Sequence, residues 1–433
     1  MAMRIARYTR GKMPMIREEY LALLQKELVP ALGCTEPIAI AYAAARCRRL
    51  LGFFPEHMTV SCSGNIIKNV KGVIVPTTGD MRGVDTSALL GALAGNPELE
   101  MEVLRDVKPS DVDKVRLMRA ENICEVRLIP GGANLHILVE MTGDGHTALV
   151  EIMDAHTHVI REEKDGHICM TSEPARVTRE QTQRRQMTVG GIYEFANTVP
   201  LKDIVPILKP QVDYNLTIAR EGLRGEYGAQ VGRTCLESGE QTARRKAIAY
   251  AAAGSDARMS GCALPVVINS GSGNQGMTVS LPAIMYAAEM KLPEEKMYRA
   301  LALSNLIALY QKSFIGELSA YCGVISAACG SAAAIAYLCG DDLKVISDSI
   351  INTIADVSGM VCDGAKPSCA AKIATAVEAA FMGHDMARRG KVFQSGEGLV
   401  KNSVDETIAA FGRMGREGMR ATDEEILHIM VDQ

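Results

Sequence analysis

The spacing of apolar residues changes twice along the chain and divides it into three blocks. Residues 16–51 carry apolar side chains at helical spacing, whereas residues 58–169 contain short Val- and Ile-rich runs separated by Gly, Asn and Asp, a pattern typical of strands. From Val189 onward, Ala- and Leu-rich helical segments alternate with Gly-containing breaks. The pattern predicts an α+β fold. A mainly helical domain is expected from residues 16–52 and 189–433, with a smaller α/β domain inserted at 53–188.

Within the inserted segment, one helix is expected over the Ala- and Leu-rich run from Met81 to Ala94. Six histidines also fall in this segment. His156 and His158 would share one face of a strand, because side chains two residues apart point the same way. Such a pair could hold a metal ion, although half-exposed strand positions are the commoner role.

Two breaks have the composition of an anion-binding turn. Ser63, Gly64 and Asn65 follow a predicted strand directly, and the stretch 269–277 (NSGSGNQGM) places three glycines among Ser, Asn and Gln. Loops dense in backbone N–H groups suit a carboxylate or a phosphate. The stretch 269–277 is not a nucleotide-binding fingerprint, since no Lys-Ser/Thr pair follows it and no βαβ unit surrounds it. Ordinary helix-connecting turns are the alternative.

A cysteine lies at the junction of the first two predicted helices. Thr35 is the expected N-cap of the second helix, with Pro37 in its first turn. Cys34 would then lie beside the positive end of the helix dipole, which favours the thiolate. A buried free cysteine is the alternative.

Composition supports a helical core and narrows the range of partners. Apolar residues make up 47% of the 433 residues and aromatic residues 4%, with no Trp and 23 Met, which favours close-packed helices over a β-sandwich. The net charge is −4 and mixed, so neither nucleic acid nor a membrane surface is expected as a partner. No signal-peptide core or spanning apolar run is seen. Twelve cysteines in such a chain indicate reduced thiols and a cytoplasmic location.

Cysteines concentrate in a segment of small residues between residues 318 and 372. Small residues let helices approach closely and leave room for a group that is not a side chain, so we hypothesise an iron–sulfur cluster. Neither the paired spacing of zinc sites nor the ferredoxin run occurs, and buried core cysteines are the alternative from spacing alone. Cys322 and Cys329, which are seven residues apart, would share a helix face. Five cysteines lie in this segment: Cys322, Cys329, Cys339, Cys362 and Cys369.

Six motifs together resemble the L-cysteine desulfidase family, which is related to the iron–sulfur L-serine dehydratases mainly through the helical domain. The likeness covers nearly the whole chain, from about Glu18 to Met430. The motifs are G-C-T-E-P at 33–37, S-G-N-x-x-K-N at 63–69, D-x-R-M at 256–259, S-G-S-G-N-Q-G at 270–276, L-S-A-x-C-G at 318–323 and M-V-C-D-G-A-K-P-S-C at 360–369.

The resemblance implies a [4Fe–4S] cluster held by three cysteines, with one iron left open for substrate. Similarity to the dehydratases points to Cys322, Cys362 and Cys369 as ligands. The desulfidase family also implicates Cys34, and the sequence does not rank Cys34 against Cys369. The implied reaction is β-elimination of L-cysteine to sulfide, ammonia and pyruvate, with the open iron as a Lewis acid.

Such a reaction also needs groups that hold the amino acid and a base for the Cα proton. The candidate bases or carboxylate partners are Lys68, Lys312 and Lys366, although solvated lysine is the commoner state. The thiolate of whichever of Cys34 and Cys369 is not a ligand is another candidate base. The substrate-binding candidates on the two Gly-containing loops are Ser63, Asn65, Lys68, Ser272, Asn274 and Gln275.

Three alternatives stay open at this point. The same chemistry on L-serine or another β-substituted amino acid would release a different leaving group. A cluster-bearing amino-acid sensor would bind the small molecule without turnover. A helical protein with buried cysteines and no cofactor is the simplest reading. The oligomeric state is also open, with a homodimer as one option.

Overall fold

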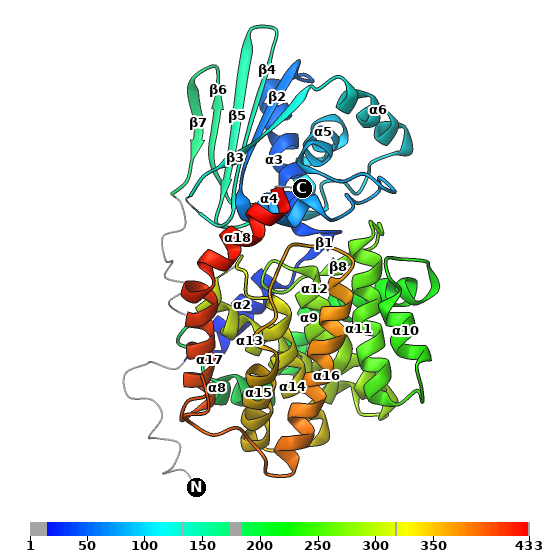
Figure 1. Ribbon diagram of the computed structural model, residues 1–433, viewed down its shortest axis with the longest axis vertical. Helices are drawn as coiled ribbons and strands as arrows, with labels where there is room; N and C mark the ends of the chain where they lie inside the picture. Colours follow the sequence, from blue (N-terminus) through cyan, green and yellow to red (C-terminus); the bar gives the residue numbers. More distant parts are fainter. Residues whose placement is uncertain (1–14, 132, 174–183, 317, 432–433) are drawn as a thin grey trace.

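A six-stranded sheet and a stack of long helices lie at opposite ends of the molecule (Figure 1). The computed structural model describes residues 15–131, 133–173, 184–316 and 318–431. The arrangement confirms the predicted α+β fold. The division into two domains stays a prediction.

The sheet has strand order β3-β2-β4-β5-β6-β7, with β2 and β3 parallel and the other neighbours antiparallel. Alternate residues of β4 and β5 are buried, because one face of the sheet packs against a helix, α3. That helix also packs against α5. The bounds are α3 Thr35–Leu51, β2 His57–Ser63, α5 Val84–Ala94, β3 Cys124–Ile129, β4 His136–Gly143, β5 His146–Met153, β6 Val159–Lys164 and β7 His167–Thr171.

Three local expectations for this region differ from the structure. Residues 156–158 form the turn between β5 and β6, so His156 and His158 do not share a strand face. The His158 ring contacts the Met153 carbonyl oxygen and the Ser172 hydroxyl, whereas His156 lies beside Glu36. The N-cap of α3 is Cys34 and not Thr35. The helix expected from Met81 begins at Val84, and further short helices flank it: α4 Gly64–Lys71, η1 Pro97–Glu102 and α6 Pro109–Ala120.

The helical end is built around α14, a helix of small residues that packs against α12, α13, α15 and α16. A short antiparallel pair, β1 with β8, ties the N-terminal segment to this end and interrupts the expected all-helical run. The bounds are α2 Arg17–Glu27, β1 Pro30–Leu32, α8 Val189–Thr198, α9 Leu201–Arg224, α10 Val231–Glu237, α11 Ala243–Met259, β8 Pro265–Val267, α12 Gly273–Glu289, α13 Glu294–Ile315, α14 Gly323–Cys339, α15 Leu343–Val357, α16 Cys369–Arg388, α17 Val404–Arg413, η2 Met414–Gly418 and α18 Arg420–Val431.

Glycine and alanine set the distances between these helices. A methyl group on Gly222 of α9 would lie 1.9 Å from the Ala253 carbonyl oxygen of α11. One on Gly276 of α12 would lie 2.0 Å from the Val267 carbonyl oxygen of β8. The backbones touch at these points, so a larger residue would have to separate them. Among the described helices, none has the length and hydropathy needed to cross a bilayer.

We predict that Gly222→Ala destabilises the protein, although alanine is the better helix former by about 1 kcal/mol. Overpacking at the α9–α11 contact should cost about 1–3 kcal/mol and outweigh that gain. Gly190→Ala, in α8 where the nearest atom is 3.8 Å away, is the matched control and should be neutral or stabilising. Urea unfolding of both variants measures this. A Gly222→Ala protein as stable as the wild type would show that the backbones do not touch.

Candidate active site

The first turns of five helices, α3, α4, α12, α14 and α16, line a single cavity of about 90 Å³. We call it the thiol cavity. The unpaired N–H groups of a first turn carry partial positive charge, so this convergence favours anionic ligands such as thiolates and carboxylates. The cavity has room for several water molecules. Its lining includes Cys34, Glu36, Asn65, Asn69, His156, Arg258, Ser272, Asn274, Gln275, Lys312, Tyr321, Cys322, Cys362 and Cys369.

All four cysteines proposed around the cluster therefore line one cavity. The segment before α14 is paired with the segment before Gly364: the Cys362 amide donates to the Ala320 carbonyl at 2.6 Å, and the Cys322 amide donates to the Met360 carbonyl at 3.2 Å. This pairing places the Cys322 thiol within hydrogen-bonding reach of Cys362. The left-handed φ of Gly364, +92°, turns the chain back toward α16, whose first residue is Cys369.

The two paired thiols have opposite tendencies to ionise. The hydrogen bond from Cys322 lowers the pKa of Cys362, against its burial, and the Lys68 ammonium lowers it further. The same hydrogen bond, together with burial, raises the pKa of Cys322. Cys362 is thus the thiol that ionises first, which is the state in which cysteine binds metal.

Cys34 does not behave as its position at a helix N-terminus suggested. Its thiol donates to Glu36 at 3.1 Å, and burial followed by the charge of Glu36 raises its pKa well above the usual value. Burial disfavours the charged Glu36, but the hydrogen bond and charge of His156 outweigh it and lower the pKa of Glu36 to about 2. Asn69 donates to the same carboxylate at 3.0 Å. Cys34, Glu36 and His156 thus form one connected group.

The Gly-rich loop is folded tightly onto the cavity. Ser270 and Gly271 both have left-handed φ values, +51° and +72°, and the Ser272 hydroxyl then caps α12 by accepting from the Gln275 amide. The turn presents Asn274 to Arg258, whose guanidinium donates to the Asn274 side-chain oxygen at 3.2 Å and to the Gly33 carbonyl at 2.9 Å. A buried guanidinium therefore stands in the cavity wall.

Several buried acceptor atoms around the cavity have no protein partner among the described residues: Asn65 Oδ1, Asn69 Oδ1 and Gln275 Oε1. An unsatisfied buried polar atom costs about 1–3 kcal/mol, so these oxygens need a hydrogen-bond donor, which a bound ligand or a water molecule can supply. A carbonyl-type oxygen accepts a hydrogen bond and matches a donor such as an ammonium group. The acceptors and Arg258 together suit a molecule that carries both an amino group and a carboxylate.

Of the remaining predicted residues, all but Lys312 lie outside the lining of the thiol cavity. Ser63 and Lys68 line a second cavity of about 550 Å³, which shares Asn65, Leu318 and Ser319 with the first. The Ser63 hydroxyl donates to the Asn134 carbonyl at 2.8 Å. Lys366 pairs with Asp363 and donates to the backbone, so it does not face the thiol cavity. Lys312 does line it.

Several residues that line the thiol cavity were not among the site residues predicted from the sequence. Glu36, Asn69 and Arg258 fall inside quoted motifs, so the motifs carried a signal for them. His156 was considered only as part of a possible metal-binding pair with His158, and no motif linked it to the cavity, which it reaches from the β5–β6 turn. Conversely, Cys322 caps α14 while Cys329 lies buried inside it near the Ile350 carbonyl, so the expected shared helix face was wrong.

Comparison with known proteins agrees with this geometry. A family model described as serine dehydratase alpha chain matches residues 98–428, three quarters of the chain. The chain belongs to the serine dehydratase alpha chain family. It is also similar to proteins named only UPF0597 protein: from Lachnoclostridium phytofermentans (47% identical, 96% of this chain and 100% of the relative), from Treponema denticola (42%, 96% and 98%) and from Aeromonas hydrophila (39%, 95% and 95%).

This relation to the iron–sulfur serine dehydratases indicates a lyase with an iron–sulfur cofactor, and the thiol cavity fits such a group. Three thiols, of Cys322, Cys362 and Cys369, line it together, and thiolates are the ligands that iron–sulfur clusters take. All twelve cysteines are free, so these thiols are available.

A carboxylate contributes to holding the C-terminal helix at the site, where Lys71 also donates to the Met430 carbonyl oxygen. Asp423 of α18 accepts from Asn65 at 2.8 Å and pairs with Lys68, whose side chain is 1% exposed. Removing one partner of a buried pair leaves an uncompensated charge, which costs about 3 kcal/mol. We predict that Asp423→Ala lowers the free energy of opening of α18 by about that amount, measured by hydrogen exchange of residues 420–431.

Glu425→Ala is the control, because Glu425 is exposed on the same helix and its loss should leave exchange unchanged. Equal protection of α18 in the wild type and in Asp423→Ala would mean that the ion pair does not hold the helix.

Proposed function

We propose that the protein is an iron–sulfur-dependent lyase that eliminates the β-substituent of L-cysteine and releases sulfide, ammonia and pyruvate. One observation supports this most: three thiols share a small cavity with a buried guanidinium and unsatisfied amide oxygens, at the convergence of helix N-termini. A cytoplasmic location is part of the proposal, since the free thiols require a reducing compartment.

Cys322, Cys362 and Cys369 are the proposed cluster ligands. Cys369 is preferred to Cys34 because it follows directly on the loop that carries Cys362, whereas the Cys34 thiol is engaged by Glu36. When bound, an open-site [4Fe–4S] cluster supplies a Lewis acid that makes the β-substituent a better leaving group.

The chain's own residues would orient the amino acid in the remaining space. The Arg258 guanidinium and the N–H groups at the start of α12 offer positive charge to the substrate carboxylate. The side-chain oxygens of Asn65 and Gln275 accept from its ammonium group. Two opposite contacts fix the direction of the Cα–H bond, which is the positioning that elimination requires.

Proton removal from Cα is assigned to the connected group around Cys34. The Cys34 sulfur would take the Cα proton in its thiolate form, and its contact with Glu36 at 3.1 Å fixes its position. Because burial and the charge of Glu36 raise the pKa of Cys34, the fraction of thiolate grows with pH. His156 and Asn69 hold Glu36 in place. Lys312, which lines the same cavity, is the second candidate for the base.

L-serine is the alternative substrate, and the description of the matching family model favours it. The same cavity would then expel hydroxide in place of sulfide. The leaving group alone separates the two candidates.

Turnover of both substrates by anaerobic, reconstituted full-length protein tests the proposal. We expect kcat/KM for L-cysteine to exceed that for L-serine by at least about tenfold, equivalent to 1.4 kcal/mol, with sulfide and pyruvate released in equal amounts. Preference for L-serine would replace the proposed substrate, and amino-acid binding without pyruvate would indicate a sensor.

A series of Cys→Ser variants assigns the thiols. Cys322→Ser, Cys362→Ser and Cys369→Ser should each lower the iron content of the reconstituted protein, because serine is a poor ligand for the cluster. Cys34→Ser should retain iron and lose at least about 100-fold in kcat, the usual range for a lost base. Cys262→Ser, outside the thiol cavity, is the control. Iron loss in Cys34→Ser with retention in Cys369→Ser would exchange the two roles.

A further inference from the structure

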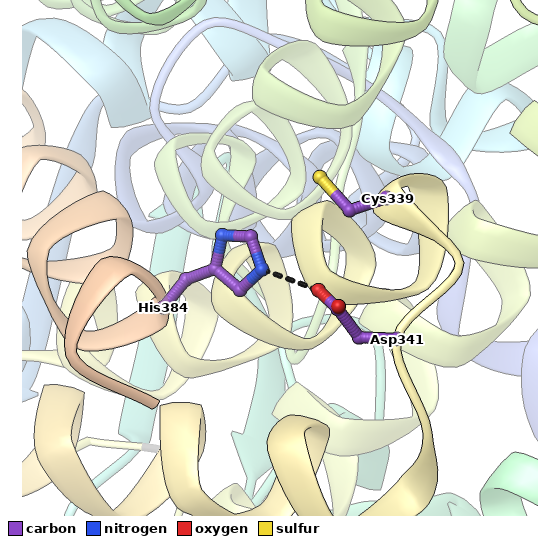
Figure 2. A group of neighbouring side chains, drawn as sticks. All are labelled: Cys339, Asp341 and His384. Atoms are coloured by element: carbon purple, nitrogen blue, oxygen red, sulfur yellow. Dashed lines mark hydrogen bonds and ion pairs between the residues drawn. The ribbon is translucent and has the colours of Figure 1, made fainter. Parts of the chain in front are cut away.

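A second group of metal-binding side chains lies away from the thiol cavity. Cys339 ends α14, Asp341 lies in the turn to α15, and His384 lies near the end of α16 (Figure 2). Their ligand atoms, one thiol, one carboxylate oxygen and one imidazole nitrogen, all lie within 4.8 Å of one another. We propose that these three residues bind a zinc-type divalent cation.

The group is already arranged around a shared point. Figure 2 shows the His384 ring and the Asp341 carboxylate pointing at each other, with Nε2 and Oδ2 2.7 Å apart. Zinc bonds of 2.0–2.3 Å place ligand atoms roughly 3.3–3.8 Å apart in a tetrahedron. A cation would therefore separate this pair slightly. The Cys339 sulfur lies no more than 4.8 Å from either atom and would have to come within roughly 3.8 Å of both.

The chemistry of the donors selects the class of metal. Sulfur, imidazole nitrogen and a single carboxylate oxygen form a set of mixed softness that suits Zn²⁺, whereas Mg²⁺ and Ca²⁺ take oxygen ligands. The charges also balance, since a thiolate and a carboxylate offset a divalent cation. Balance matters because His384 is 3% exposed and an uncompensated buried charge is costly. Three protein ligands leave the fourth position to water.

Neighbouring side chains occupy the outer positions that metal sites usually show. The Arg388 guanidinium lies 3.5 Å from Oδ1 of Asp341, the oxygen that does not face His384, so it can stay in place while Oδ2 binds the metal. The Tyr286 hydroxyl lies 3.4 Å from the Cys339 sulfur and would donate to the thiolate.

The location gives the cation a structural role. Cys322 precedes α14 and Cys369 begins α16, so two of the five helices that start at the thiol cavity end at this group. A helix of 17 residues such as α14 is about 25 Å long. A cation here would join the far ends of the two helices and limit their sliding. This inference does not depend on the proposed reaction.

Zinc binding by the full-length, metal-depleted, reduced protein tests the proposal. The titration uses Zn²⁺ against a chromogenic chelator, with Cys339→Ser and His384→Gln as variants. His136→Gln is the matched control, because His136 also pairs with a carboxylate, Glu151 at 2.8 Å, in the sheet. Thiols of the thiol cavity contribute equally to every protein, so the difference between proteins is the readout.

We expect the wild type and His136→Gln to bind one more equivalent of Zn²⁺ than either variant. With Co²⁺, the wild type should also show more sulfur-to-metal charge-transfer absorption than Cys339→Ser. Equal zinc binding in all four proteins would overturn the proposal and leave His384 and Asp341 as an ordinary ion pair. If His384→Gln does not fold, Cys339→Ser decides, since it changes a single atom.

Discussion

The convergence of five helix N-termini on one cavity is the constraint on which the rest of the structure depends. Each first turn contributes N–H groups without helical partners, and gathering them at one point concentrates positive potential. The chain places thiols, a carboxylate and amide oxygens there, from Cys34 and Glu36 to Cys362 and Gln275. An anionic ligand completes this balance. The site is thus defined by the backbone before any one side chain is considered.

Close packing makes that convergence possible. Helices made of Ala and Gly approach until their backbones touch, as Gly222 and Gly276 show. Behind the Gly-rich loop, a buried amide network fixes its position: Asn305 bonds both Gln211 and Asn269 at distances of 2.8–3.0 Å. Rigid support of this kind holds polar groups toward a cavity at a cost that the packing around them offsets.

Local sequence signals were enough for the main blocks of helix and strand and for much of the site. The helical period, the strand runs and six motifs placed Cys34, Asn65, Gln275 and Cys362 near functional loops, and the structure brings these residues to one cavity. Contacts between distant segments carry no local signal. His156 reaches Glu36 from the β5–β6 turn, and its spacing from His158 suggested a metal pair rather than this contact.

The ionisation state of individual side chains could also not be predicted from the local sequence. A helix N-terminus favours a thiolate, but burial and the Glu36 carboxylate outweigh it at Cys34. Lys366 was a candidate base in the sequence, but it forms an ion pair with the carboxylate of Asp363, three residues earlier. Burial and partners decide such cases, and both arise only from the tertiary fold.

The central claim is that the thiol cavity holds a cluster with one iron open to the amino acid. Mössbauer spectroscopy of protein reconstituted with ⁵⁷Fe, with and without L-cysteine, tests it most directly. The account predicts that about one iron in four changes its environment when L-cysteine is added, while the others keep theirs. Four irons that do not respond to the amino acid, or a folded protein that takes up no cluster, would contradict it.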